Sequence, residues 1–351
     1  MIRILVDSPP LIFIGNAHHP TGALISGRLF LHVLEPTITI EMFRVRFLCT
    51  TTALKPVARA CPDCASRTNE LEQWDFLENP CILSNGEHEF PFSCLVPSDL
   101  PITTRGLLGS IDYHLVAEVL TSTQETICSR EMIDIKRATT VRKDIRAVQS
   151  FPSTGLTAQC IHPSVIHPVS EFRLHMRLTG ITSWLNNIQV RLHLRELVWW
   201  VEERQEMVPT ACSRHAAKVG HKGNSTLDID KRSIGRGKLK SGWIVDFGEG
   251  VIETEFLAAV DPSLKPICDV DSKNGLSVSH SLVIEMTVAQ ELCLRKNPAQ
   301  MAPSVADKVL WTRFRVALTE RGGSGIHPDE EPPPTYKDVP TLPPAYSQLD
   351  G

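Results

Sequence analysis

Cysteine and histidine residues are the side chains of this 351-residue chain whose types and spacing could support chemistry most directly. Cys61-Pro62-Asp63-Cys64 has the two-residue gap of half a zinc knuckle or of a redox pair. A zinc site needs two further ligands, and neither a second CxxC pair nor a His-x-x-x-His pair follows nearby. We therefore interpret Cys61 and Cys64 as part of a surface loop, with metal binding as the weaker alternative, and we expect no metal and no cofactor.

Other candidate catalytic or metal-binding residues are equally weak. His175 and His193 sit among arginines on the polar sides of alternating segments, which is typical of solvated surface. Gly235-x-Gly237 lacks the full spacing of a phosphate-binding loop and a following helix, and the sequence contains no GxSxG, no HExxH and no P-loop lysine. We predict that the chain is not an enzyme.

The most specific motif occurs twice near the C-terminus, as Pro333-Pro334-Thr335-Tyr336 and Pro343-Pro344-Ala345-Tyr346. Paired prolines hold the backbone near polyproline II, and the tyrosine adds a flat apolar ring, which together form the ligand pattern of WW domains. A solvated tail without a partner is one alternative. A second is a different polyproline-binding domain that reads Pro340-x-x-Pro343, but it leaves both tyrosines unexplained. The residues predicted to bind WW domains are Pro333, Pro334, Tyr336, Pro343, Pro344 and Tyr346.

Composition narrows the class of protein further. The net charge of −4 argues against general nucleic-acid binding. No segment approaches eighteen consecutive apolar residues, so we expect no membrane span, and the N-terminus becomes charged and proline-rich too early for a signal peptide. Ten cysteines lie at irregular spacing, several at apolar strand-like positions such as Cys49, Cys94 and Cys293. This pattern favours free thiols in a reducing cytosol rather than a disulfide framework.

The segments that must position any site alternate between apolar and polar residues. The clearest cover 111–119, 172–178, 188–194, 282–288 and 314–318. A period of two predicts strands with one buried and one solvated face, which antiparallel sheets allow and parallel sheets rarely do. The chain is therefore predicted to be all-β, with antiparallel β-sandwiches.

Charged and breaker-rich residues near 140–155 predict a boundary between an N-domain at 1–145 and a C-domain at 155–320, followed by a disordered tail at 321–351. An irregular insert is predicted over about 204–241, where 214–240 holds eight basic residues against Asp228 and Asp230. This insert could be a solvated loop, a docking patch for acidic cargo tails or anionic lipid, or a site of lysine ubiquitylation. The candidate patch residues are Lys218, Lys222, Lys231, Arg232, Arg236, Lys238 and Lys240.

Four stretches, together with the tail, resemble the α-arrestins, the arrestin-related trafficking adaptors. Residues 90–101, from Phe90-Pro91-Phe92 to Leu100-Pro101, and 109–118, from Gly109-Ser110 to Ala117-Glu118, are similar to the signature of an arrestin N-domain. Gly22 with 27–31 resembles an early N-domain strand, and 279–284 resembles a C-domain pattern. Trp199-Trp200 and the long loops suggest a fungal member.

The resemblance implies two arrestin-type sandwiches and an adaptor function. In that family the tail recruits a HECT-type ubiquitin ligase through WW domains, and the arrestin body recognises plasma-membrane transporters or receptors. Ubiquitin is then attached to the cargo, and often to the adaptor, which drives endocytosis. A cytoplasmic protein recruited to the plasma membrane and endosomes is expected. The alternative is an arrestin-like sorting or signalling scaffold that acts without a ligase.

Overall fold

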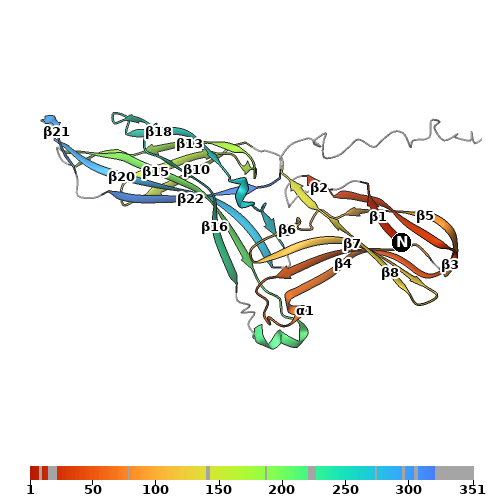
Figure 1. The fold of residues 1–351 in the computed structure, drawn as a ribbon. Coiled ribbons are helices and arrows are strands. Elements are labelled where there is room, and N and C mark those ends of the chain that lie inside the picture. The colour runs from red at the N-terminus through yellow and green to blue at the C-terminus, as the bar shows by residue number, and fades with distance from the viewer. Residues whose placement is uncertain are drawn as a thin grey trace, which may run out of the picture.

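The computed structural model describes residues 1–7, 10–14, 22–77, 79–139, 143–185, 188–219, 227–272, 275–294, 297–303 and 307–320. Within these ranges almost every regular element is a strand, and nearly all pairings are antiparallel (Figure 1). Among the described residues, the exceptions are two short parallel strand pairs, β2 with β9 and β12 with β22, and one isolated parallel bridge between Ala138 and Glu320. The prediction of an all-β fold built from antiparallel sheets is confirmed.

The first half of the chain contains one short helix and nine strands among its described residues. They are β1 (Ile2–Val6), β2 (Leu11–Ile14), β3 (Ala23–Ala53), α1 (Pro62–Ala65), β4 (Ser66–Asp75), β5 (Cys81–Val96), β6 (Thr104–Arg105), β7 (Gly109–Thr121), β8 (Thr126–Ile133) and β9 (Ile135–Ala138).

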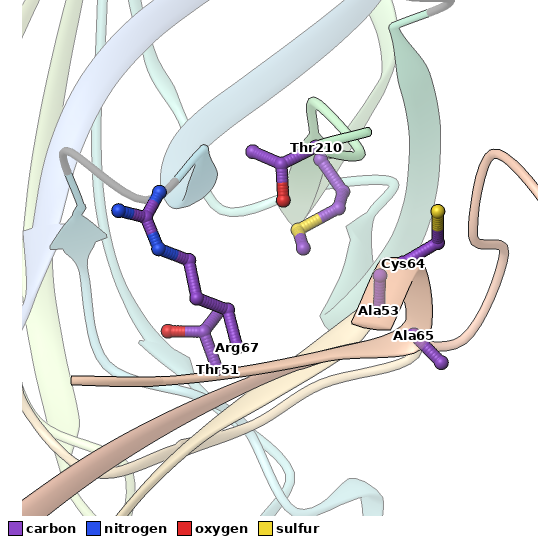
Figure 2. A pocket seen from close by; sticks show the side chains of 7 residues that line it. Thr51, Ala53, Cys64, Ala65, Arg67 and Thr210 are labelled. Carbon is purple, nitrogen blue, oxygen red and sulfur yellow. The ribbon is translucent and has the colours of Figure 1, made fainter. Parts of the chain in front are cut away.

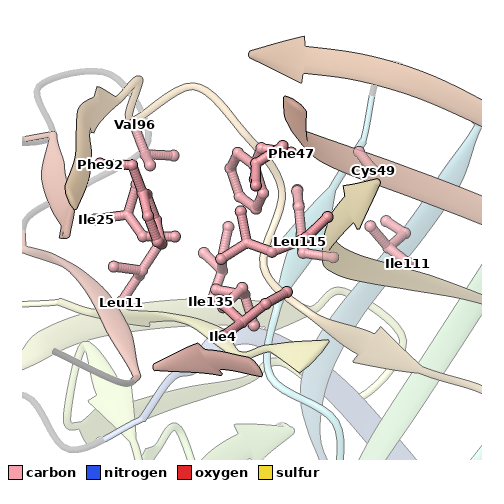
Figure 3. Close-up of a cluster of buried hydrophobic side chains, with 14 of the residues drawn as sticks. Ile4, Leu11, Ile25, Phe47, Cys49, Phe92, Val96, Ile111, Leu115 and Ile135 are labelled. Atoms are coloured by element: carbon pink, nitrogen blue, oxygen red, sulfur yellow. The ribbon is translucent and has the colours of Figure 1, made fainter. Parts of the chain in front are cut away.

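Strand β3 organises this first half because its two parts belong to the two layers of one folded seven-stranded sheet. Its first part pairs with β1 and β5, and its second part, from Ile40 onward, pairs with β7, while β4 pairs with 44–52. Alternate side chains of the two layers therefore face one another and form a single core. Figure 3 shows Ile25, Phe47 and Leu115 meeting in that core, and each is at most 1% exposed.

The second half holds the remaining described elements. They are β10 (Ile145–Phe151), β11 (Leu156–His162), β12 (Val165–Ile166), β13 (Glu171–Thr179), β14 (Thr182–Leu185), β15 (Ile188–Met207), the 3₁₀ helix η1 (Ser213–Val219), β16 (Asp228–Leu239), β17 (Ile244–Asp246), β18 (Val251–Ala259), η2 (Pro262–Leu264), β19 (Val270–Asp271), β20 (Leu276–Leu294), β21 (Asn297–Pro303) and β22 (Lys308–Leu318).

Two sheets of this half pack over a second core. One has the order β10-β11-β13-β18-β17, and the other is built around β12-β22-β20-β15-β14, with β16 on β15. Leu174 and Met176 of β13 meet Val201 of β15 and Ile284 of β20 between the two layers. The strands predicted from alternation at 111–119, 172–178, 188–194, 282–288 and 314–318 are confirmed as parts of β7, β13, β15, β20 and β22.

The two halves meet at the ends of the longest strands of the second half. Met207 ends β15, and Leu276 and Val278 begin β20, yet all three belong to the hydrophobic core of the first half. Cys268 and Val270, just before β20, join them there. The second half therefore contributes side chains to the core of the first, which couples the two by burial of apolar surface.

The prediction of an irregular insert over 204–241 is wrong for most of that range. Residues 204–207 complete β15, and 228–239 form β16, which pairs with β15 along its length. Glycines and many charges hide the alternation of β16. Gly235 is required because an added Cβ would lie 2.2 Å from the carbonyl oxygen of Ala259. What remains between the two strands is the connection 208–227, which carries η1.

Candidate functional site

The predicted WW-binding residues, Pro333, Pro334, Tyr336, Pro343, Pro344 and Tyr346, lie outside the described residues, as do the side chains of Lys218 and Lys222. Lys231, Arg232, Arg236 and Lys238 are on β16 rather than on a loop, and Lys240 directly follows that strand. Three of them form ion pairs with glutamates of β15: Lys231 with Glu202 at 3.8 Å, Arg232 with Glu203 at 2.7 Å, and Lys238 with Glu196 at 2.6 Å. Arg236 and Lys240 are exposed. These pairs reduce the positive charge that β16 presents to a partner.

His175 and His193 both lie on the polar sides of their strands and are half-buried. The Nε2 of His193 is 2.8 Å from a carboxylate oxygen of Glu291 on the neighbouring strand, and its ring packs on Phe247. The surface prediction for His193 thus needs correction, because the ring is held in a side-chain pair rather than freely solvated. All ten cysteines, each within the described part of the chain, carry free thiols.

A set of five polar side chains lies where the two halves meet; we call it the joint cluster. Its members are Glu203, Gln205, Arg232, Asp269 and His280. Glu203 has no exposed surface, and its carboxylate accepts hydrogen bonds from Arg232 Nε at 2.7 Å and from Gln205 Nε2 at 2.7 Å. On the other side, His280 Nδ1 is 2.5 Å from Asp269 Oδ1 and its Nε2 is 3.6 Å from Glu203 Oε2.

Backbone groups from both halves complete the joint cluster. The N–H of Ile267 donates to Glu203 Oε2 at 2.9 Å, and the N–H of Leu107, in the first half, donates to Gln205 Oε1 at 2.7 Å. A chain of hydrogen bonds thus runs from Leu107 through Gln205 and Glu203. Because buried polar groups are costly when unpaired, this network favours one arrangement of the two halves.

The same contacts shift two pKa values in opposite directions. Burial opposes ionisation of Glu203, but the nearby His280 ring and hydrogen bonds from Arg232, the backbone of Ile267 and Gln205 outweigh it and lower its pKa to about 2. Burial also disfavours the charged form of His280, but its hydrogen bond with Asp269 and the nearby Glu203 carboxylate raise its pKa above the ordinary value of 6.5. Glu203 is therefore ionised near neutral pH, and the folded protein favours the protonated form of His280 more than water does.

We expect the protein to be most stable between about pH 4.5 and 6.5 as far as these two groups decide it. The lowered pKa of Glu203 stabilises the fold above the unfolded value of 4.5 and is lost as pH falls toward about 2. The raised pKa of His280 stabilises the fold below 6.5 and is lost as pH rises through the folded value. Melting temperature measured across pH should fall on the alkaline side, and less steeply for His280→Gln. An unchanged alkaline slope in that variant would contradict the assignment.

A second group joins the two halves through four ligand-type side chains; we call it the thiol–imidazole cluster. Cys61 immediately precedes α1 and Cys64 lies within it; both are buried, so their interpretation as part of a surface loop is wrong. Cys212 and His215 lie in the connection between β15 and β16. Figure 1 shows that connection lying against α1. One ligand atom from each residue, a Cys Sγ or a His ring nitrogen, lies within 4.8 Å of all the others. Such a set can hold a soft divalent metal ion or, if oxidised, form a disulfide.

Hydrogen bonds already connect the four residues. Cys212 Sγ is 3.2 Å from His215 Nδ1 and 3.8 Å from Cys61 Sγ, and Cys64 Sγ is 3.5 Å from His215 Nδ1. Partial burial opposes ionisation of Cys212, but hydrogen bonds with His215, Cys64 and Cys61 lower its pKa to about 6. For Cys64, the N–H of Cys212 favours the thiolate, but burial and the neighbouring thiols raise its pKa above 9.0.

Two hollows lie beside this cluster, and the one lined by Cys61, Arg214 and His215 has a volume of about 430 Å³. The other hollow has a volume of about 40 Å³, and Figure 2 shows Arg67 on one side of it with Cys64 and Ala65 on the other. Pockets for small molecules usually occupy about 300–1,000 Å³. Of these two hollows, the one beside Cys61 and His215 reaches this range.

Comparison with known proteins identifies the fold family. The model of a family described as LDB19, Arrestin_N terminal like, matches residues 43–219, about half of the chain. The chain belongs to the LDB19 arrestin-like family. The prediction that the chain is an arrestin-related protein of fungal type is confirmed. The prediction of arrestin-type sandwiches is confirmed with it.

Three relatives of this LDB19-family chain are fungal proteins. Two uncharacterized proteins of Schizosaccharomyces pombe are 31% and 29% identical, each over 99% of the chain, which covers 89% and 94% of their own lengths. Protein LDB19 of Eremothecium gossypii is 28% identical over 61% of this chain, and the matched region is 33% of that protein. The full protein LDB19 is thus much longer than the part this chain resembles.

Sequence reasoning missed several residues that this LDB19-family fold brings together. Cys212 and His215 complete the set begun by Cys61 and Cys64, and the signal in the sequence was the Cys-x-x-His spacing, which matches that of Cys-x-x-Cys. Glu203 and His280 carried no signal, since each stands at an ordinary position of an alternating strand. Among the described residues, no helix of this chain has the length and apolar character needed to cross a membrane.

Proposed function

We propose that this LDB19-family chain is an adaptor that brings a HECT-type ubiquitin ligase to membrane cargo. Its body belongs to the LDB19 arrestin-like family. The tail carries two Pro-Pro-x-Tyr motifs, which have the chemistry of WW-domain ligands. The observation that carries the proposal is the presence of both motifs in one chain with that body.

The proposal divides the work between body and tail. The body binds plasma-membrane transporters or receptors, and the tail binds the WW domains of the ligase, which performs the chemistry. The chain itself is then non-enzymatic and is recruited from the cytoplasm to the plasma membrane and endosomes. Ubiquitin is transferred to the cargo and to lysines of the adaptor. The arrestin-like family and the absence of any enzyme motif in the sequence support this division.

Substitution of the motif tyrosines tests the ligase-binding part. We expect Tyr346→Ala to weaken co-purification of the intact chain with a WW-domain ligase, and Tyr336→Ala with Tyr346→Ala to abolish it, because each ring fills an aromatic groove. Thr335→Ala is the matched control, since this position varies between the two motifs, and should bind normally.

A further control separates WW binding from the alternative polyproline-binding domain. Pro340→Ala removes the first proline of Pro340-x-x-Pro343 but leaves both Pro-Pro-x-Tyr motifs intact. WW binding should survive this change. If Pro340→Ala released the ligase and the double tyrosine variant retained it, the tail would be read by another class of domain.

A further inference from the structure

Two tight turns from distant parts of the chain face each other at the thiol–imidazole cluster. In the first, the N–H of Cys64 donates to the carbonyl of Cys61 at 3.2 Å; in the second, the N–H of His215 donates to the carbonyl of Cys212 at 2.9 Å. Each turn therefore presents two ligands, spaced three residues apart, from one side. A turn of this kind with two ligands is half of a structural zinc site, and two of them supply four ligands.

The distances between ligand atoms match a tetrahedral ion. Zinc lies about 2.3 Å from sulfur and about 2.0–2.1 Å from nitrogen, so tetrahedral angles put sulfur atoms about 3.8 Å apart and sulfur–nitrogen pairs about 3.6 Å apart. The Cys61–Cys212 separation is 3.8 Å, and His215 Nδ1 lies 3.5 Å from Cys64 and 3.2 Å from Cys212. The two ligand atoms that lie farthest apart are at most 4.8 Å from each other. Side-chain rotation that shortens this separation by about 1 Å brings them to the tetrahedral distance.

We infer that Cys61, Cys64, Cys212 and His215 bind one structural zinc ion that fastens the β15–β16 connection to the first half of the protein. This site is independent of the proposed ligase and cargo binding. Three thiolates and one imidazole favour zinc over hard cations such as Mg²⁺, and four protein ligands leave no open position for catalysis.

Neighbouring groups stabilise the negative charge of the thiolates, as a metal site requires. The backbone N–H of Cys212 donates to Cys64 Sγ at 3.5 Å, and Arg214 Nη2 lies 3.9 Å from Cys61 Sγ. Three thiolates around Zn²⁺ carry a net charge of −1, which the Arg214 guanidinium offsets. Arg214 is itself held by Asp63 of α1 at 2.5 Å, so it also links the two turns.

Metal analysis of the purified full chain is the first test. We expect about one zinc ion per chain, and X-ray absorption at the zinc edge should show three sulfur neighbours at about 2.3 Å and one nitrogen at about 2.0–2.1 Å. His215→Ala and Cys212→Ser should each reduce the zinc content to near zero. His215→Cys should retain about one ion, because a fourth thiolate replaces the imidazole.

Two matched controls make these variants specific. Cys128→Ser changes an exposed cysteine of β8, and His175→Ala changes a histidine of β13; both should keep a full zinc content. A full chain that folds with all thiols reduced but holds no zinc, or a His215→Ala variant that keeps it, would overturn the inference. A disulfide between Cys61 and Cys212 in the purified protein, seen by mass spectrometry, would do the same.

Limited trypsin digestion tests the fastening role. In the zinc-loaded chain, cleavage after Arg214 should be slow because the turn is fixed to α1. After a strong chelator, cleavage there should become fast, while Arg173 in the interior of β13, though exposed, should stay uncut because its sheet remains folded. Equal cleavage after Arg214 with and without zinc would show that the ion does not hold the connection.

Discussion

Glu203→Gln is expected to lower the free energy of unfolding by about 3–5 kcal/mol, because it removes the charge at the centre of a buried ion pair. Glu203 has no exposed surface and faces the Arg232 guanidinium, whose charge would lose its partner, and the His280 ring. The neutral amide keeps a single acceptor oxygen, so its NH2 group must face donors, either those of Arg232 and Gln205 or the N–H of Ile267. Equilibrium urea unfolding measures the change.

Glu255→Gln is the matched control for this effect. Glu255 pairs with Arg173 at 3.0 Å, but its side chain is 52% exposed, so its loss should cost about 0–1 kcal/mol. A combined Glu203→Gln, His280→Gln variant should lose less than the sum of the single changes, because each removes the other's partner. Equal costs for Glu203→Gln and Glu255→Gln would show that the joint cluster does not stabilise the contact between the halves.

Two WW domains linked in tandem are expected to bind the intact chain about 10²–10⁴-fold more tightly than a single WW domain. The motifs begin at Pro333 and Pro343, and in polyproline II their starts are at most about 31 Å apart. Once one motif is bound, the second domain meets its ligand at a high effective concentration. Isothermal titration of the full chain with the tandem pair and with the single domain measures the ratio.

Tyr346→Ala should abolish the advantage of the tandem pair and leave binding at the level of one domain. Binding of the single WW domain should change by no more than about two-fold, since one site of two remains. If the tandem pair and the single domain bound the intact chain equally well, the two motifs would act independently and their repetition would have no energetic role.

Much of the fold could be predicted from alternation, because a half-buried strand leaves a period of two in its residues. Strand β13, with Phe172, Leu174 and Met176 inward, is an example. Strand β16 was missed because its exposed positions are charged and Gly235 is needed against Ala259. The charges of β16 make sense only beside the glutamates of β15, which a linear pattern does not place next to them.

The candidate site was predictable only in part. Cys61 and Cys64 stand close enough in sequence to attract notice, but their partners follow more than a hundred residues later. Only the folding of β15 back toward the first half brings Cys212 and His215 to α1. The joint cluster gave no signal, since burial of Glu203 and His280 is a property of the contact between halves. The tail motifs needed no fold, because their recognition depends on local sequence.

Proximity labelling in cells tests the adaptor proposal most directly, with the intact chain compared with the Tyr336→Ala, Tyr346→Ala double variant. We expect the intact chain to label both a WW-domain ligase and membrane transporters or receptors. The double variant should lose the ligase and retain the membrane proteins, because the arrestin body is unchanged. Retention of the ligase by the double variant, or labelling of no membrane protein by either form, would contradict the proposed adaptor.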